Sequence, residues 1–168
     1  KSGGYAYRLA SGDIFIVNAN EIHSIEEDAE ENMVFCCHIN KEYFTRYYPE
    51  LENRFFFIGF KMQHSEGTEI LRDRINQAML EIMEKGRHYK DKVVETTHNM
   101  VAHMLASFSY SLEEGEQEER SGSKVLTRRL IRIMNYICKN YSRKLTLNEI
   151  AERENQSIYY LSHIIKEY

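Results

Sequence analysis

The chain has 168 residues, of which 42% are hydrophobic, a balance that suits one compact domain or two small ones. It has no apolar run of about 20 residues, which excludes a transmembrane helix by sequence, and its first residues do not resemble a secretory signal. Its three cysteines, Cys36, Cys37 and Cys138, lack CxxC spacing, which argues against a disulfide framework and a zinc ribbon. We therefore expect a protein of the reducing cytoplasm, with Cys36 and Cys37 as buried thiols of an apolar run.

Charge is distributed unevenly along the chain. Residues 1–122 hold 13 basic and 22 acidic side chains, a net charge of -9, whereas residues 123–168 hold nine basic and four acidic ones, a net charge of +5. A basic C-terminal module on an acidic body is typical of proteins in which that module binds a polyanion. A basic face that is merely solvated is the alternative that charge alone leaves open.

Residues 5–39 are rich in β-formers. The run from Asp13 to Val17 lies between two turn signals, Ser11-Gly12 and Asn18-Ala-Asn20, and a second apolar run covers residues 32–39. Neither run alternates cleanly between apolar and polar residues. This predicts largely buried strands of a barrel or sandwich.

The pattern Leu9-x-x-Gly12-Asp13-Ile-Phe-Ile-Val17, followed by His23, resembles the cupin-type sensor domain at the N-terminus of AraC/XylS-family regulators. The resemblance covers about thirty-five residues. Members of that family often carry prolines where this chain has Asn18 and Asn20. A complete barrel needs more strands than these residues supply, so we expect only part of one.

Residues 41–60 are rich in aromatic side chains, and the only proline, Pro49, ends the short segment that begins near Glu42. One interpretation is a helical turn whose rings cap an open barrel; the other is a lid over a ligand. The resemblance implies a small-molecule effector bound in the sensor domain. The candidate effector-binding residues are His23, Tyr43 and Tyr47.

Two helices are predicted next, over residues 67–85 and 90–112. Thr68 is a candidate N-cap of the first helix, and Gly86 stands where its C-terminal cap is expected. The second helix carries an apolar seam at steps of three and four. Its main residues are Val94, Thr97, Val101, Met104 and Phe108.

Two interpretations of this seam stay open: an interface between two copies of the helix, and a hairpin packed on its own sheet. AraC-type sensors commonly dimerise through helices at this place in the chain. The resemblance therefore implies a homodimer, with Val94, Val101, Met104 and Phe108 as the dimerisation residues.

Residues 113–123 hold five acidic residues, two glycines and no apolar side chain, a composition that predicts a linker. A basic amphipathic helix is expected over residues 124–141. Its predicted inner face comprises Leu126, Leu130, Ile133 or Met134, Ile137 and Tyr141. Arg128 and Arg129 fall largely outside that face, where they could contact phosphates.

The last 24 residues predict two short helices joined by a tight turn. Thr146 and Glu149 form a T-x-x-E capping box at the start of the first helix, about 147–154. Ser157 is a good N-cap for the second, about 158–167. The small Ala151, the turn residue Asn155 and the inner Leu161 have helix-turn-helix spacing. Glu154 and Gln156 stand where that motif usually has apolar residues.

This segment resembles the first helix-turn-helix of the AraC/XylS DNA-binding domain. The matching residues are Leu147-x-x-Ile150-Ala151 and Ser157-x-x-Tyr160-Leu161-Ser162-x-x-Ile165-Lys166. Ile165 stands where Phe is usual, and Asn155 where Gly is common. The family's domain carries two such motifs joined by a long helix, so we expect residues up to Tyr168 to bind DNA weakly or not at all by themselves.

The second helix of the motif is expected to enter the major groove with its N-terminal half. Tyr160, Leu161 and Ile164 or Ile165 are expected to point toward the core. The predicted outward residues are Ile158, Tyr159, Ser162 and His163. Of these, Ser162 and His163 can read base edges, while Lys166 and Arg128 or Arg129 are better placed for phosphates.

The predicted fold class is α+β: a partial cupin-like β-barrel, a helical pair and a C-terminal helix-turn-helix bundle. The predicted domains are 1–61 (sensor), 62–112 (dimerisation), 113–123 (linker) and 124–168 (half of a DNA-binding domain). The predicted function is a ligand-responsive, dimeric regulator that binds double-stranded promoter DNA. It is not expected to be an enzyme or to bind a cofactor, a metal or a membrane.

Two alternatives belong to other functional classes. A metal-dependent cupin enzyme would need clustered ligands, but His23 and His38 lack H-x-H spacing. His98 and His103 are about 140° apart around a helix and share no face. A scaffold that only dimerises is disfavoured by the basic C-terminus and the pattern of the last helix.

Overall fold

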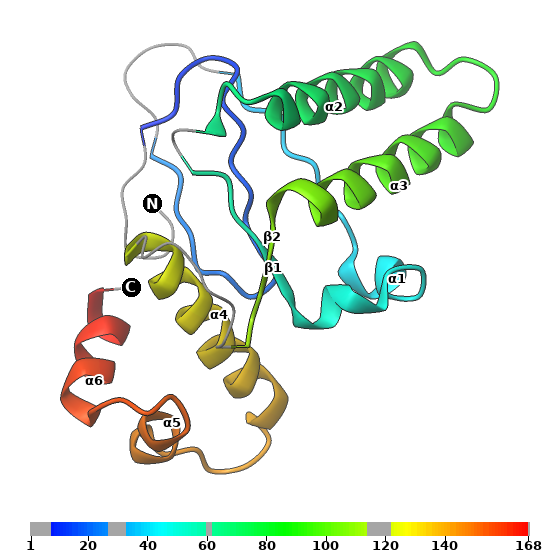
Figure 1. The fold of residues 1–168 in the computed structure, drawn as a ribbon. Helices are drawn as coiled ribbons and strands as arrows, with labels where there is room; N and C mark the ends of the chain where they lie inside the picture. The colour runs from blue at the N-terminus through cyan, green and yellow to red at the C-terminus, as the bar shows by residue number, and fades with distance from the viewer. Residues whose placement is uncertain (1–7, 27–32, 60–61, 114–121, 168) are drawn as a thin grey trace. The chain divides into compact units, whose positions relative to one another are not determined.

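The computed structural model divides the chain into two compact units (Figure 1). It describes residues 8–26, 33–59, 62–113 and 122–167. We call Leu9–Ile16 with Glu31–Ser111 the hairpin unit. The C-terminal unit consists of Lys1–Arg8, Val17–Glu30 and Leu112–Tyr168. The linker predicted at 113–123 lies mostly outside the described residues.

The hairpin unit is built on two long antiparallel helices, α2 (Glu66–Glu84) and α3 (Tyr89–Phe108) (Figure 1). The predicted caps of α2 were each misplaced. Ser65, not Thr68, is the N-cap, and its side chain accepts a hydrogen bond from the backbone N–H of Thr68. At the other end Lys85, not Gly86, adopts the left-handed conformation, with φ of 48°.

The core of the hairpin unit is formed mainly by buried side chains of these two helices. Leu71 of α2 packs with Met100 and Phe108 of α3 and with Ile58. Gly67 permits the close approach at the start of α2, because a Cβ atom there would lie 3.2 Å from the Phe108 ring. His103 Nε2 lies 2.7 Å from the Gly67 carbonyl oxygen, which ties the same two helices together.

Shorter elements complete the hairpin unit: α1 (Lys41–Thr45), the 3-10 helix η1 (Pro49–Asn53) and the strands β1 (Arg54–Phe56) and β2 (Ser109–Ser111). The strands pair antiparallel with Phe55 opposite Tyr110. β2 lies inside the range 90–112, which was predicted to be helical throughout. Asn40 caps α1, since its side chain accepts from the Tyr43 N–H at 3.0 Å.

The predicted cupin-like barrel is wrong. Among the described residues the only sheet is β1–β2, and the rest of the regular structure is helical. The run from Asp13 to Val17 is extended but forms no ladder. Instead, the buried side chain of Gln63 takes the place of a partner strand: it accepts from the Ile14 N–H at 3.0 Å and donates to the Ile14 carbonyl at 2.9 Å.

The described part of the second predicted strand, 33–39, forms no strand either. Met33 is 99% exposed, and Cys36 and Cys37 are exposed rather than buried. Both extended runs still contribute apolar side chains, because Ile14, Ile16 and Ile39 pack against the core of the hairpin unit. Apolar content therefore predicted burial for part of these runs, but not a β-ladder, which needs a partner strand in register.

The C-terminal unit contains α4 (Gly122–Asn140), α5 (Leu147–Arg153) and α6 (Ile158–Glu167), close to the predicted bounds. Ile133 of α4 packs with Ile150 and Ala151 of α5 and with Leu161 of α6. Tyr141, predicted on the inner face of α4, is exposed and follows the end of the helix. None of the helices in the described ranges has both the length and the apolar content of a membrane span.

Candidate nucleic-acid interface

The start of α5 is capped as the T-x-x-E pattern predicts. The Thr146 Oγ1 atom accepts from the Glu149 N–H at 3.2 Å. The Glu149 carboxylate accepts in turn from the Arg143 guanidinium, with Nη1 and Oε2 3.1 Å apart, and from the Tyr136 hydroxyl. The pKa of Glu149 is lowered from 4.5 to about 2. The main cause is the hydrogen bond from Arg143, followed by that from Tyr136, and the backbone N–H of Thr146 has a smaller effect. The carboxylate thus stays charged and holds α5 to the loop before it and to α4.

The turn between α5 and α6 is a Schellman motif. Asn155 is left-handed, with φ of 50°, as its position in the sequence predicts. The Asn155 N–H donates to the Glu152 carbonyl at 3.1 Å, and the Gln156 N–H donates to the Ala151 carbonyl at 2.9 Å. Ser157 then caps α6, because its Oγ atom accepts from the Tyr160 N–H at 3.1 Å. Capped helices on both sides of a four-residue turn fix the angle between α5 and α6.

A buried ion pair joins α4 to this turn, and sequence reasoning missed it. Glu154 is buried, and its Oε2 atom accepts from Arg132 Nε at 3.0 Å and from Arg132 Nη2 at 2.5 Å. Arg132 also donates to the Leu112 carbonyl at 3.2 Å. The sequence did contain a sign of this ion pair, namely the acidic Glu154 at a position where the motif usually has an apolar residue. A charge that replaces a core residue needs a buried partner.

The inner face of α6 is set by Leu161 and Ile164, both of which are buried. Ile165 is exposed, which decides between the two candidates that the spacing left open. Tyr160 was expected to point toward the core, but its ring is partly exposed and its hydroxyl accepts from Arg129 Nη1 at 3.1 Å. The Arg129 guanidinium also lies 5.6 Å from the centroid of this ring.

The outer face of α6 has the predicted composition. Tyr159 is 80% exposed, Ile158, His163 and Lys166 are exposed, and Ser162 is half-buried. Tyr159 and His163 are four residues apart, as are Ser162 and Lys166, so each pair shares a face of the helix. The Ser162 hydroxyl donates to the Tyr159 carbonyl at 2.9 Å, and a hydroxyl bound in this way keeps its acceptor capacity.

The two arginines predicted to contact phosphates lie in different environments. Arg129 lies beside α6, and its bond to Tyr160 uses one of its five N–H donors. Arg128 is only 8% exposed, so it does not belong to the outer face. The prediction assumed that α4 buries one side alone, whereas Thr127 and Ile131 are buried as well. Asn135 of α4 also accepts from Asn20 Nδ2 at 2.8 Å, in an exposed contact.

The three residues predicted to bind an effector belong to two different units. His23 belongs to the C-terminal unit, and its Nδ1 atom lies 3.1 Å from the Glu21 carbonyl. Tyr43 and Tyr47 belong to the hairpin unit, where the rings of both contact His98 of α3, that of Tyr47 at 4.8 Å between centroids. A hydrogen bond with the Tyr47 side chain is the main cause that raises the pKa of Tyr43. These aromatic side chains pack on a helix rather than capping a barrel.

The predicted dimerisation residues lie largely inside their own unit. Val101 and Phe108 are buried in the two clusters that hold the hairpin unit together. Met104 is half-buried against one of them, while Val94 is 46% exposed. The seam is therefore occupied within the protomer, in line with the interpretation of α3 as part of a self-packed hairpin.

No protein-family model, curated protein or solved structure matches the chain. The resemblance to the AraC/XylS family thus stays a prediction that depends on the residues quoted for it.

Proposed function

We propose that the C-terminal unit binds double-stranded DNA through α6, and that the chain acts as a transcription regulator of the AraC/XylS type. The observation that carries the proposal is the junction of α5 and α6. Two capped helices meet at a tight turn with a left-handed Asn155, and Leu161 locks them onto α4. This is the local geometry that presents a recognition helix.

The outer face of α6 supports the chemistry of this proposal. His163 and the Ser162 hydroxyl can hydrogen-bond base edges in the major groove, and Tyr159 and Ile158 can contact a thymine methyl group or a sugar. Lys166 lies in the last turn of α6 and Arg129 beside its first turn. At these places both cations can neutralise phosphates that flank the groove, which positions the helix without specifying sequence.

Charge supports the same assignment. Residues 123–168 have a net charge of +5, against -9 for residues 1–122. A duplex is attracted to the basic module and repelled by the acidic body, which favours one orientation of approach.

Ligand response and homodimerisation remain separate parts of this proposal. Of the four α3 residues predicted to form the dimer interface, only Val94 is exposed, because the others are buried or half-buried in their own protomer. A dimer would therefore need other residues besides Val94. Light scattering of the purified chain across concentrations tests this part without reference to DNA.

DNA binding can be tested with the chain as it stands. A duplex selected from a random-sequence library at low salt serves as the probe, and fluorescence anisotropy measures Kd. We expect Ser162→Ala and His163→Ala each to reduce discrimination against other sequences by about 1–3 kcal/mol. We expect Lys166→Ala to weaken binding to all duplexes alike and to reduce the slope of log K against log salt by about 1.

Lys90→Ala is the matched control, because Lys90 is an exposed lysine of α3 in the other unit. It should leave both the affinity and the slope unchanged. The proposal is wrong if the α6 variants and Lys90→Ala have the same affinity, discrimination and salt dependence.

A further inference from the structure

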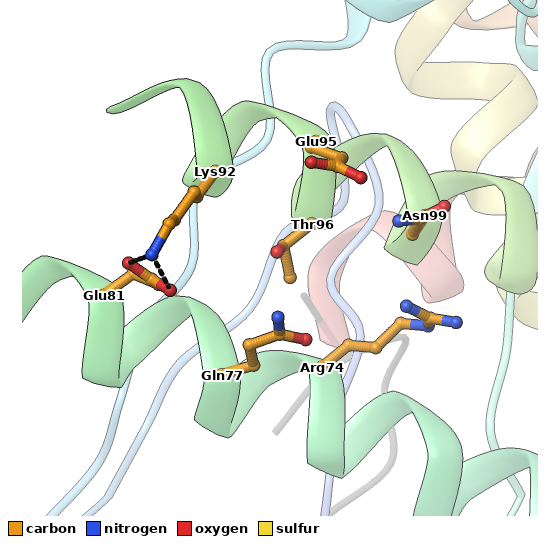
Figure 2. Close-up of a pocket in the computed structure, with 7 residues that line it drawn as sticks. All are labelled: Arg74, Gln77, Glu81, Lys92, Glu95, Thr96 and Asn99. Carbon is orange, nitrogen blue, oxygen red and sulfur yellow. Dashed lines mark hydrogen bonds and ion pairs between the residues drawn. The ribbon is translucent and has the colours of Figure 1, made fainter. Parts of the chain in front are cut away.

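A polar groove lies between α2 and α3 of the hairpin unit. None of the residues that line it is among those proposed to bind DNA. Its volume is about 370 Å³, and it is lined by Arg74, Gln77, Glu81, Lys92, Glu95, Thr96 and Asn99. Figure 2 shows that these side chains come from both helices, with Thr96 and Gln77 pointing toward each other across the groove. The volume is at the lower end of the range for small-molecule sites.

One end of the groove is closed by an ion pair, and the other holds an unpaired cation. Lys92 Nζ lies 3.1 Å from Glu81 Oε1, so these two charges satisfy each other (Figure 2). At the other end, the Nε atom of Arg74 is buried and has no hydrogen-bond partner among the described residues. Arginine cannot lose its charge in a protein, and Arg74 forms no ion pair with any described residue. A bound anion would be held by its terminal amino groups, which Figure 2 shows at the Asn99 end of the groove.

The planar fork of a guanidinium matches a carboxylate. Thr96, which is buried, and Asn99 and Gln77 add hydroxyl and amide groups on the same walls. Glu95 lines the groove as well, and no described group forms an ion pair with it. The lining thus offers one unpaired positive and one unpaired negative charge, which disfavours polyanions such as phosphate esters.

We propose that the α2–α3 groove binds a small zwitterion, a molecule with a carboxylate held by Arg74 and an ammonium group held by Glu95. Free amino acids have this chemistry and fit the volume. The site is distinct from the predicted effector residues His23, Tyr43 and Tyr47. It goes beyond the proposed DNA binding and does not depend on it.

NMR spectroscopy of the ¹⁵N-labelled full chain provides the test. The probes are the twenty proteinogenic amino acids at millimolar concentration, with acetate and ethylamine as single-charge analogues. At least one amino acid should shift the Arg74 Nε–H resonance and the backbone amides of Thr96 and Asn99 in a saturable way. Acetate and ethylamine should each bind at least about 10-fold more weakly, since each lacks one charge-assisted contact.

Three variants define the roles of the two charges. We expect Arg74→Lys, which keeps the charge but loses the planar fork, and Glu95→Gln, which loses the negative charge, to raise Kd by about 10- to 100-fold. Arg87→Gln, at an exposed arginine in the loop between the same helices, should leave Kd unchanged. Circular dichroism establishes that all three fold.

Several results would overturn the proposal. One is the absence of a saturable shift with every amino acid. Another is a response that spares Arg74 and the groove amides. Equal binding of acetate, or an affinity unaffected by Glu95→Gln, would refute the role of the ammonium group. None of these measurements contains DNA, so a negative result here leaves the proposed function untouched.

Discussion

The two helical pairs of this protein are stabilised in different ways. The hairpin pair, α2 and α3, has helices of 19 and 20 residues. The pair α5 and α6 has helices of seven and ten residues. Helices shorter than about 12–15 residues are marginal alone, so the short pair needs its caps, its turn and its contacts with α4. The long pair can tolerate poorer ends because longer helices are less marginal, and because Leu71 of α2 packs with Met100 and Phe108 of α3.

The turns illustrate the difference. The loop between α2 and α3 places two side chains, Lys85 and His88, in the left-handed region, with φ of 48° and 60°. Lysine is not favoured there, whereas histidine, like Asn and Asp, is enriched in this region. The turn between α5 and α6 uses Asn155, which tolerates this conformation, and follows it with a capping Ser157.

The ion pairs give the sharpest test of this difference. Arg132→Met removes the partner of the buried Glu154 carboxylate and should lower the free energy of unfolding of the C-terminal unit by about 3–5 kcal/mol. Lys92→Met breaks a pair in the hairpin unit whose lysine side chain is 52% exposed, and it should cost at most about 1 kcal/mol. Urea denaturation followed by circular dichroism measures both. The double variant Arg132→Met with Glu154→Leu should recover most of the loss, and the explanation fails if it does not.

Core truncation comes next in size. Leu161→Ala creates a cavity at the junction of α4, α5 and α6 and should lower the free energy of unfolding by about 2–5 kcal/mol. Leu80→Ala, at an exposed leucine of α2, should change it by less than about 0.5 kcal/mol. The same denaturation experiment applies. Similar losses in both variants would mean that the hairpin depends on contacts that its exposed face does not reveal.

Turn substitutions should have smaller effects of opposite sign. Asn155→Ala places a side chain without a local hydrogen-bonding group in the left-handed region and should destabilise the C-terminal unit by about 1 kcal/mol. Lys85→Gly relieves the same strain in the hairpin unit and should stabilise it by up to about 1 kcal/mol. Thermal unfolding monitored at 222 nm compares the two. A destabilised Lys85→Gly variant would contradict the assignment of strain to this loop.

The pH response is the smallest expected difference. The pKa of Glu149 is lowered to about 2 in the folded chain, so its contribution to stability is present above its ordinary value of 4.5. That contribution is lost as the pH falls from about 5 toward 2. Arg143→Gln removes the main cause and should make the acid-induced loss of stability shallower over this window. The measurement is the free energy of unfolding in urea between pH 6 and 2.

Arg87→Gln in the hairpin loop is the control for the removal of one positive charge. It should leave the slope over the same pH window unchanged. A slope reduced equally by Arg143→Gln and Arg87→Gln would indicate a general charge effect instead of the contact between Arg143 and Glu149.

Local signals in the sequence predicted most of the helical part. The T-x-x-E box at Thr146, the left-handed Asn155 and the cap at Ser157 were all found where the sequence placed them. Each depends on hydrogen bonds between residues no more than five apart, so a short stretch of sequence contains the information. The periodicity of Leu161 and Ile164 placed the inner face of α6 for the same reason.

The tertiary structure alone decided which elements face each other. The apolar run from Asp13 to Val17 has strand composition, yet its backbone at Ile14 pairs with the side chain of Gln63, 49 residues away. The seam of α3 could have faced a second copy, yet Val101 and Phe108 are buried in their own unit. Arg128 was assigned to solvent from a helical repeat, yet a second covered side of α4 buries it. Composition and period determine that a face is apolar or charged, whereas the partner of that face depends on contacts between residues far apart in the chain.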